Sequence, residues 1–297
     1  MADEPILLGV PVGCGGARPG CEGGPGALRA AGVAAAIGAR TDLGDVPRPA
    51  ARVVRHPNPA IRGLGEAAAW IEAVGDAALG ACRGGRPVFL GGDHLMSAGT
   101  VTGVARHAAE RGRPLFVLWI DAHPDFHDLA STRTGNLHGT SLAYATGAAG
   151  FAPHLPPPAA PVVAERVSVV AARSVDPAER AAVARRGVEV KGVADASGAV
   201  SRLLGRVADA GGLLHVSLDA DALDPREAPG VGTPVPGGLS MAQARGIAAT
   251  LGESGLVTSL DLAEVNPALD PGGRTARAMV ELAAAALGRH AARRKAA

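Results

Sequence analysis

The stretch that decides the fold is Leu115–Asp125, which reads LFVLWIDAHPD. Its first six residues are apolar at successive positions, as expected of a strand that is buried on both faces of a parallel sheet. Its last five residues carry Asp121, His123 and Asp125 at alternate positions, and extended chain points such side chains the same way. The stretch therefore predicts a buried strand whose carboxyl end opens into a polar cluster.

Short apolar runs alternate with longer Ala-rich amphipathic segments on both sides of this stretch. This alternation indicates βαβ units and an α/β fold, with helices on both faces of a mostly parallel sheet. We interpret the Pro-rich stretch Ala152–Pro161 as a surface loop, and we expect residues 1–297 to form one domain. The predicted strands are Ile6–Val12, Val88–Leu90, Leu115–Ile120, Val167–Val170, Leu213–Leu218 and Val257–Leu260. The predicted helices are Leu64–Cys82, Ala98–Arg111, Ala178–Arg185, Asp195–Ala208, Ser240–Leu251 and Arg274–Leu287.

Composition narrows the classes of function. The 297 residues carry a formal net charge of +1, whereas binding to nucleic-acid phosphates needs a clustered basic surface, so we expect no nucleic-acid partner. The acidic start, MADEP, is unlike a secretory signal, and no apolar run reaches the roughly 18 residues of a membrane span. Cys14, Cys21 and Cys82 are odd in number and lack metal-binding spacing, so we expect free thiols and a cytoplasmic protein.

Three further predicted strands end in polar residues. His94 follows Val88–Leu90, Asp219 and Asp221 follow the strand that begins at Leu213, and Glu264 comes shortly after Leu260. Ligands of open α/β sheets bind outside the carboxyl ends of the strands, so these groups are expected to meet. Carboxylates gathered in one place repel each other unless cations neutralise them. Oxygen-rich ligation with two imidazoles suits Mn²⁺, and the absence of cysteine among the candidates argues against a closed structural zinc site.

A single Asp after a strand is more often a turn former or a helix cap than a metal ligand. Asp93 and Asp224 fit that interpretation, and Asp224 precedes a proline. The D-x-H-x-D and D-x-D patterns at two strand ends favour metal binding over chance.

In their order and spacing these motifs resemble the arginase or ureohydrolase family, over nearly the whole chain. The resemblance implies a three-layer α/β/α fold, a Mn²⁺ pair and hydrolysis of a guanidinium or related amidine. The similar stretches are Gly20–Gly32, Gly91–His94 (GGDH), Asp121–Asp125 (DAHPD), Gly135–Gly139 (GNLHG), Ser217–Pro225 (SLDADALDP) and Glu264–Pro267 (EVNP).

The resemblance also implies roles for individual residues. One metal would be held by His94, Asp121, Asp125 and Asp219, and the other by His123, Asp121, Asp219 and Asp221. Asp121 and Asp219 would bridge two Mn²⁺ ions about 3.5–4 Å apart, and a hydroxide shared by the ions would attack the guanidinium carbon. Glu264 would pair with the planar cation, because a carboxylate matches its forked donors. His138 would shuttle the proton to the leaving amine, with an ordinary loop histidine as the alternative.

The end of the pocket that would hold the amino-acid part of the substrate departs from the arginase pattern. His127 stands where that pattern has Asn, and Thr134 replaces a Ser. Asn136, within GNLHG, and Thr233, within Gly-Thr-Pro, match the family, whose Thr lies near the guanidinium. Asp176 matches a residue that contacts the substrate α-amino group, although Asp before Pro is also an ordinary turn signature.

We expect hydrolysis of L-arginine to L-ornithine and urea. The closest alternative is another ureohydrolase, acting on agmatine, a guanidino acid or formiminoglutamate, and His127 keeps it open. A deacetylase of related architecture would hold a single zinc, and a binding protein without activity would lack the complete set of ligand and catalytic residues. Family members form trimers or hexamers, so we expect a homo-trimer or homo-hexamer.

Overall fold

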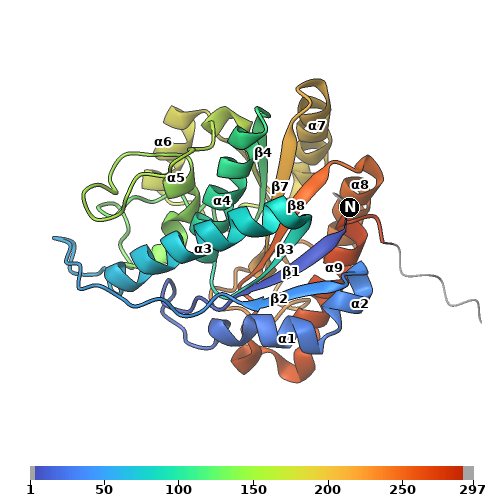
Figure 1. The fold of residues 1–297 in the computed structure, drawn as a ribbon, viewed down its shortest axis with the longest axis horizontal. Helices are drawn as coiled ribbons and strands as arrows, with labels where there is room; N and C mark the ends of the chain where they lie inside the picture. Colours follow the sequence, from blue (N-terminus) through green and yellow to red (C-terminus); the bar gives the residue numbers. More distant parts are fainter. Residues whose placement is uncertain (1–3, 290–297) are drawn as a thin grey trace, which may run out of the picture.

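The computed structural model describes residues 4–289, and the basic tail from His290 onward lies outside them. Within these residues, eight strands form one sheet in the order β2-β1-β3-β8-β7-β4-β5-β6 (Figure 1). Each neighbouring pair is parallel. The strands are β1 (Pro5–Val10), β2 (Thr41–Asp45), β3 (Arg86–Gly91), β4 (Leu115–Ile120), β5 (Val167–Val170), β6 (Glu189–Lys191), β7 (Leu213–Asp219) and β8 (Val257–Ala263).

The longer helices lie where the sequence predicts them. Ser240 and Asp176 are N-caps, each within a capping box. The helix after Ser240 therefore begins at Met241, one residue later than predicted, and the helix after Asp176 begins at Pro177, one residue earlier than predicted. The 3₁₀ turn Val193–Asp195 delays the start of α7 to Ala196. The helices are α1 (Gly24–Ala30), α2 (Val33–Ile37), α3 (Leu64–Gly84), α4 (Met96–Glu110), α5 (Ser141–Ala145), α6 (Pro177–Arg186), α7 (Ala196–Asp209), α8 (Met241–Ser254) and α9 (Arg274–Ala286).

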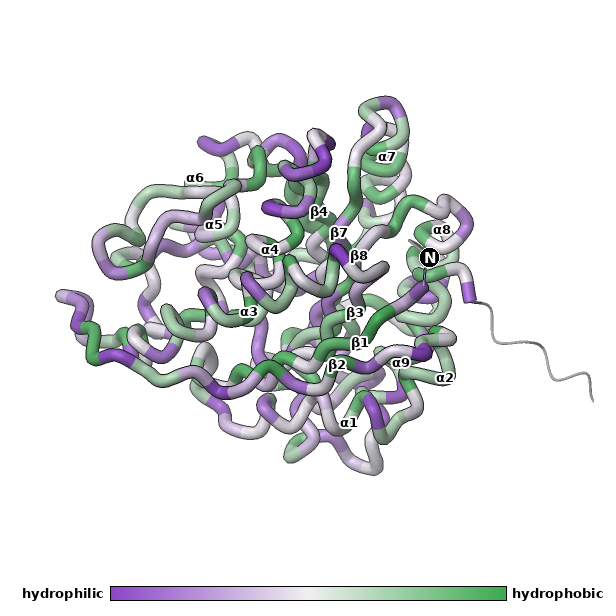
Figure 2. Tube along the Cα trace, viewed as in Figure 1, coloured by the Kyte–Doolittle hydropathy of each residue, from purple (hydrophilic) through white to green (hydrophobic). Residues whose placement is uncertain are grey.

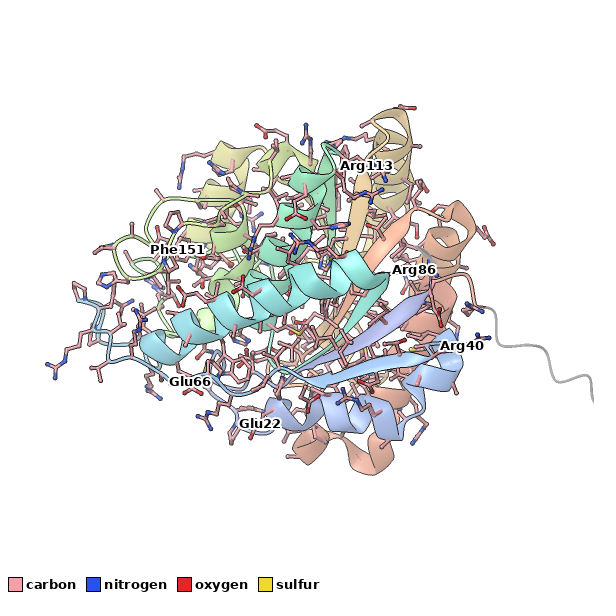
Figure 3. All side chains as sticks on the ribbon, in the orientation of Figure 1. Glu22, Arg40, Glu66, Arg86, Arg113 and Phe151 are labelled. Atoms are coloured by element: carbon pink, nitrogen blue, oxygen red, sulfur yellow. The ribbon has the colours of Figure 1, made fainter. Side chains whose placement is uncertain are left out.

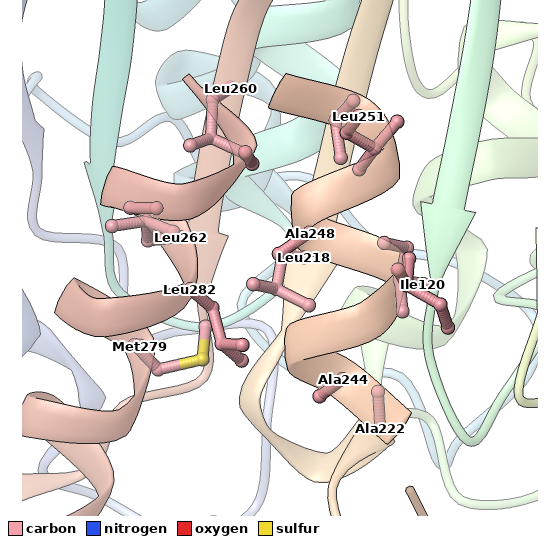
Figure 4. Packing of buried hydrophobic residues seen from close by; sticks show 14 of the residues in the cluster. Ile120, Leu218, Ala222, Ala244, Ala248, Leu251, Leu260, Leu262, Met279 and Leu282 are labelled. Carbon is pink, nitrogen blue, oxygen red and sulfur yellow. The ribbon is translucent and has the colours of Figure 1, made fainter. Parts of the chain in front are cut away.

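Alternate residues of the central strands pack on opposite faces, which gives three layers. Leu118 of β4 belongs to an apolar cluster with α1, α2, α7, α8 and α9, whereas Trp119 belongs to a cluster with α3, α4 and α5. Figure 4 shows Leu218 and Leu262 of the sheet packing against Ala248 of α8 and Leu282 of α9. This is the predicted three-layer α/β/α arrangement, with the sheet parallel throughout the described residues.

Hydrophobic residues gather along the strands, as the tube of β1 shows in Figure 2, and the outer loops are largely hydrophilic. Charged side chains such as Glu22, Arg40 and Glu66 lie at the periphery (Figure 3). From residue 4 to residue 289, no helix combines the length and the apolar character that crossing a bilayer would require.

The order of the strands places the polar strand ends side by side. β3, β8, β7 and β4 are consecutive in the sheet, so their carboxyl ends share one edge. The register pairs Ile120 with Leu218 and Asp219 with Ala263, which brings the residues that follow β4, β7 and β8 to one level. From β4 the chain continues to β5 and β6 on one side, and it then returns to β7 and β8 on the other side of β4. Such a switch point, here between β4 and β7, forms the ligand crevice of open α/β folds.

Candidate metal centre

His94 stands at the centre of the first group of side chains that can hold a metal ion. It follows β3, and its Nδ1 lies 2.8 Å from Asp219 Oδ2, 3.0 Å from Asp121 Oδ2 and 3.2 Å from Asp125 Oδ2. Both His94 Nδ1 and Asp125 Oδ2 are buried, and neither forms a hydrogen bond of regular geometry with any described residue. Buried polar atoms of this kind are rare without a partner, so this donor set fits a cation.

The second group surrounds His123 and shares Asp121 with the first. His123 Nδ1 lies 3.2 Å from Asp221 Oδ2 and 3.4 Å from Asp121 Oδ1. Asp121 therefore faces His94 through one oxygen and His123 through the other, as a bridging carboxylate does. Asp219 faces His94, and its bridging role stays a prediction.

Electrostatics also favours cations at this position. Burial, followed by the charges of Asp221 and Asp121, raises the pKa of Asp219 well above its ordinary value. Burial and Asp121 likewise raise the pKa values of Asp125 and Asp221. Burial would raise the pKa of Asp121 too, but His123 and His94 outweigh it and leave that pKa lowered. A divalent ion removes this mutual repulsion, because it favours the charged form of every carboxylate around it.

A buried network behind the centre holds His94 in place. The rings of His94 and Trp119 stack with centroids 4.1 Å apart, and Trp119 Nε1 donates to Asp121 Oδ2 at 2.8 Å. His94 Nε2 lies 2.8 Å from Ser217 Oγ, which is 3.5 Å from Asp261 Oδ2. A hydroxyl that accepts from Nε2 leaves the Nδ1 lone pair facing the carboxylates, as metal ligation requires.

The backbone is unusual at two residues of the site. Asp125 has φ 48° and Glu264 has φ 64°, in the left-handed region that residues other than glycine rarely adopt. Such strain persists where the surrounding structure enforces it, and it concentrates at functional sites. Gly92, between β3 and His94, lets its backbone lie close to Val12, because a Cβ at residue 92 would be 1.8 Å from the Val12 carbonyl oxygen.

The two predicted catalytic residues contact each other. His138 Nδ1 lies 2.7 Å from Glu264 Oε1, which also accepts from the His94 backbone N–H at 2.8 Å. Burial would lower the pKa of His138, but Glu264 and then Asp125 outweigh it and raise that pKa to about 9. The pKa of Glu264 is lowered, since His138 outweighs the effect of burial.

A cavity of about 240 Å³ opens onto the metal centre. This is small for a ligand pocket and suits a small metabolite. At one end lie His123, Asp219 and Asp221, and His138 also lines the wall. All five residues predicted to bind substrate line the same cavity: His127, Thr134, Asn136, Asp176 and Thr233. Glu264 is buried beside it and reaches it through His138.

The substrate-end residues also have structural partners. Asp176 Oδ1 caps α6 by accepting from the N–H groups of Ala178 and Glu179, so Asp176 also has the structural role that Asp before Pro indicates. Its other oxygen, Oδ2, lies 3.0 Å from His127 Nε2. Thr233 Oγ1 donates to Asp221 Oδ2 at 2.9 Å. Asp93 and Asp224 each accept the backbone N–H two residues further on, as turn formers do, and each also accepts a more distant one, from Gly15 and Gly237 respectively. Both residues therefore have the structural role that was expected of them.

Five residues of the site were not predicted from the sequence. Two of them, Glu179 and Ser174, line the cavity. The other three, Trp119, Ser217 and Asp261, support His94 or its ligand Asp121. Glu179 has a signal that could have been used, because it stands three residues after Asp176 in a capping box. A buried Asp261 in the middle of β8 has no sequence signature that separates it from a strand-end ligand.

Comparisons with known proteins agree with this geometry. Residues 3–288 match the model of the arginase family. The chain belongs to the arginase family. It is 52% identical to an arginase of Brucella melitensis over 295 residues, which cover 95% of each chain. It is 50% identical to an arginase of Agrobacterium fabrum, over 95% of this chain and 90% of that relative. The solved arginase of Bacillus caldovelox superposes with a TM-score of 0.83 at 32% identity, covering 97% of this chain and 99% of that one. As a family member, the chain combines the three-layer fold with His/Asp groups that can bind metal.

Proposed function

We propose that the protein hydrolyses L-arginine to L-ornithine and urea. The observation that carries the proposal is the 50–52% identity to arginases along almost the whole chain. One cavity is lined both by residues of the two His/Asp groups and by the polar residues His127 and Asp176. This supports the proposal, because arginine has a guanidinium at one end and an ammonium at the other.

The proposed cofactor is a pair of Mn²⁺ ions, one beside His94 and one beside His123. Asp121, Asp125, Asp219 and Asp221 would complete the ligand set, which is rich in oxygen and contains no thiol. When bound, such a pair supplies water activated for attack on the guanidinium carbon near neutral pH.

The chain's own residues would orient the substrate and move the proton. Glu264 Oε1 is occupied by the His94 N–H and by His138, whereas Oε2 accepts from the Cys21 thiol at 3.6 Å. Because a thiol is a weak donor, Oε2 would be the oxygen that pairs with the guanidinium. Because Glu264 holds His138 Nδ1, Nε2 is the ring atom left to deliver a proton to the leaving amine. Thr233, beside Asp221, would contribute a hydroxyl near the reacting carbon.

The other end of the cavity would select the amino-acid part of the substrate. Asp176 and Glu179 present carboxylates there, and these suit an α-ammonium group. Thr134 and Asn136 line the wall near His127 and would face the substrate carboxylate. A substrate that lacks the α-amino and carboxylate groups, such as agmatine, would leave these polar residues without partners.

The test measures urea release from L-arginine, agmatine, guanidinobutyrate and guanidinopropionate by enzyme dialysed against Mn²⁺. We expect the largest kcat/KM for L-arginine. A clear preference for a substrate without the α-amino group would overturn the arginase assignment and favour another ureohydrolase. Metal analysis of the same sample distinguishes two manganese ions per chain from the single zinc of the deacetylase alternative.

We also propose a cytoplasmic protein that forms a homo-trimer or homo-hexamer. The three cysteines, Cys14, Cys21 and Cys82, are free thiols, which fits a reducing compartment. Sedimentation of the full chain measures the assembly, and a monomer at micromolar concentration would contradict it.

A further inference from the structure

A third group of side chains that could ligate a metal lies in the same cavity and shares no residue with the first two groups. We call His127, Asp176 and Glu179 the His127 triad. His127 is in the loop after β4, Asp176 caps α6, and Glu179 is in the first turn of that helix. All three line the cavity that opens onto the metal centre.

The spacing of the triad resembles that of the two groups already described. His127 Nε2 lies 3.0 Å from Asp176 Oδ2 and 3.5 Å from Glu179 Oε2. The His94 and His123 groups have nitrogen-to-oxygen distances between 2.8 Å and 3.4 Å. Ligands about 2.1 Å from one ion in tetrahedral or octahedral geometry are separated by about 3.0–3.4 Å. The distances in the three groups, from 2.8 Å to 3.5 Å, lie close to that separation, so all three have roughly the dimensions of a metal site.

The remaining atoms of the triad are held from behind, which leaves one donor atom of each residue directed inward. Glu179 is 6% exposed, and its Oε1 accepts from the Phe126 N–H. Its Oε2 accepts the long capping-box bond from the Asp176 N–H at 3.5 Å and lies 3.5 Å from His127 Nε2. Asp176 uses Oδ1 for the helix cap and keeps Oδ2 for His127. His127 Nδ1 lies 3.2 Å from Ser131 Oγ, an arrangement that orients metal-binding imidazoles.

The three inward-directed atoms, His127 Nε2, Asp176 Oδ2 and Glu179 Oε2, can all donate a lone pair to a cation. Carboxylate oxygens are acceptors only, and an imidazole that donates through Nδ1 presents a lone pair at Nε2. One nitrogen and two carboxylate oxygens from three side chains, with the open cavity in the remaining direction, form the ligand set of an accessible zinc-type site.

We propose that the His127 triad binds a third divalent cation, separate from the pair at the metal centre. The ligands would be His127 Nε2, Asp176 Oδ2 and Glu179 Oε2, with water or a ligand group from the cavity completing the shell. Mixed nitrogen and oxygen ligation by three side chains selects a first-row ion of the zinc type over Mg²⁺ or Ca²⁺.

A cation in the triad changes what the cavity accepts. The two carboxylates that would otherwise face a substrate ammonium are then neutralised, and the ion occupies the same space. Excess Zn²⁺ therefore competes with a substrate that carries an α-ammonium group, raising its KM without changing kcat. This consequence rests on the proposed function, whereas the binding of the ion does not.

The experiment counts divalent ions on the full chain. Wild type, His127→Asn, Glu179→Gln and His56→Asn are loaded with Mn²⁺, dialysed to equilibrium against micromolar Zn²⁺, and analysed for total manganese plus zinc per chain. His56→Asn is the matched control, because the His56 ring lies 4.7 Å from the His154 ring and this imidazole pair is a separate place where zinc could collect. Thermal unfolding of each variant establishes that it is folded.

We expect one ion more per chain in wild type and in His56→Asn than in His127→Asn or Glu179→Gln. Equal ion counts in wild type and the two triad variants would overturn the proposal, as would loss of the extra ion in His56→Asn. The initial rate is measured in parallel: Zn²⁺ should raise KM several-fold in wild type and leave KM unchanged in His127→Asn. If L-arginine is not hydrolysed at all, the proposed function fails, and the ion count still decides the third site.

Discussion

Replacing Asp261 by Asn tests the buried network that supports the metal centre. Asp261 is fully buried in β8, and its Oδ2 accepts from Ser97 Oγ at 2.6 Å and Thr100 Oγ1 at 2.7 Å, with His215 Nε2 at 3.2 Å. Burial would raise its pKa, but His215 and the two hydroxyls outweigh burial and hold that pKa below the usual range. The side chain is therefore a carboxylate held by charge-assisted hydrogen bonds.

The expected loss of stability in Asp261→Asn follows from where the atoms of the amide would lie. Asn can place its oxygen at the Oδ2 position and keep both hydroxyl bonds in neutral form. Its NH₂ group would then take the Oδ1 position, where no described residue offers a hydrogen bond. Oδ1 has no hydrogen-bond partner among the described residues in the wild type either, so this exchange adds little. The larger cost is the lost negative charge, because the interactions of Oδ2 with Ser97, Thr100 and His215 each weaken by about 1 kcal/mol. We expect a loss of roughly 2–4 kcal/mol in the free energy of unfolding.

Urea denaturation with EDTA present measures this loss by linear extrapolation. Asp209→Asn is the matched control, because it makes the same chemical change at an exposed helix end and should alter stability by less than about 0.5 kcal/mol. Metal affinity is the second readout: Asp261 acts on His94 through Ser217, and loss of such support typically weakens binding about 10–100-fold. A loss below about 1 kcal/mol together with unchanged metal affinity would refute the reasoning.

Three further predictions concern the site. His138→Asn should retain metal and lower kcat about 10²–10⁴-fold, because the proton donor is lost. Unchanged turnover with normal metal content would contradict the role of His138 as proton shuttle. Removing metal with EDTA should lower the free energy of unfolding. The loss should be about 4 kcal/mol relative to protein in a free metal concentration a thousand times the Kd. Calorimetry measures this loss, and an unchanged melting temperature would count against the site. Burial raises the pKa of Glu179 from 4.5 to about 7, so the folded state holds its proton more tightly than the unfolded state, and the wild type loses stability as pH rises through this window. Glu179→Gln cannot titrate, so in EDTA its stability relative to wild type should increase by roughly 2 kcal/mol between pH 5 and pH 8, and a pH-independent difference would exclude this role.

Much of the architecture could be predicted from the sequence because the central strands are buried on both faces. β4 and β5 have the predicted limits, and the other predicted strands differ only at their ends. β2 and β6 were missed because they lie at the edges of the sheet, are wholly or partly exposed and lack a continuous apolar run. α1, α2 and α5 were missed because each is short, with five to seven residues, and has too few turns for a helical period to show.

The sequence by itself determined that Asp121, His123 and Asp125 follow a buried strand and that His94, Asp219 and Asp221 follow others. Since parallel strands end at a common edge, the sequence predicted that the six lie on the same side of the sheet. The order β3-β8-β7-β4, which only the tertiary structure decided, makes their strands neighbours and brings the six together. Only the tertiary structure decided which oxygen of Asp121 faces which histidine. It also decided that His127 meets Asp176 and Glu179, because α6 is separated from His127 by some fifty residues of chain and only the packing of that helix brings its first turn to the cavity.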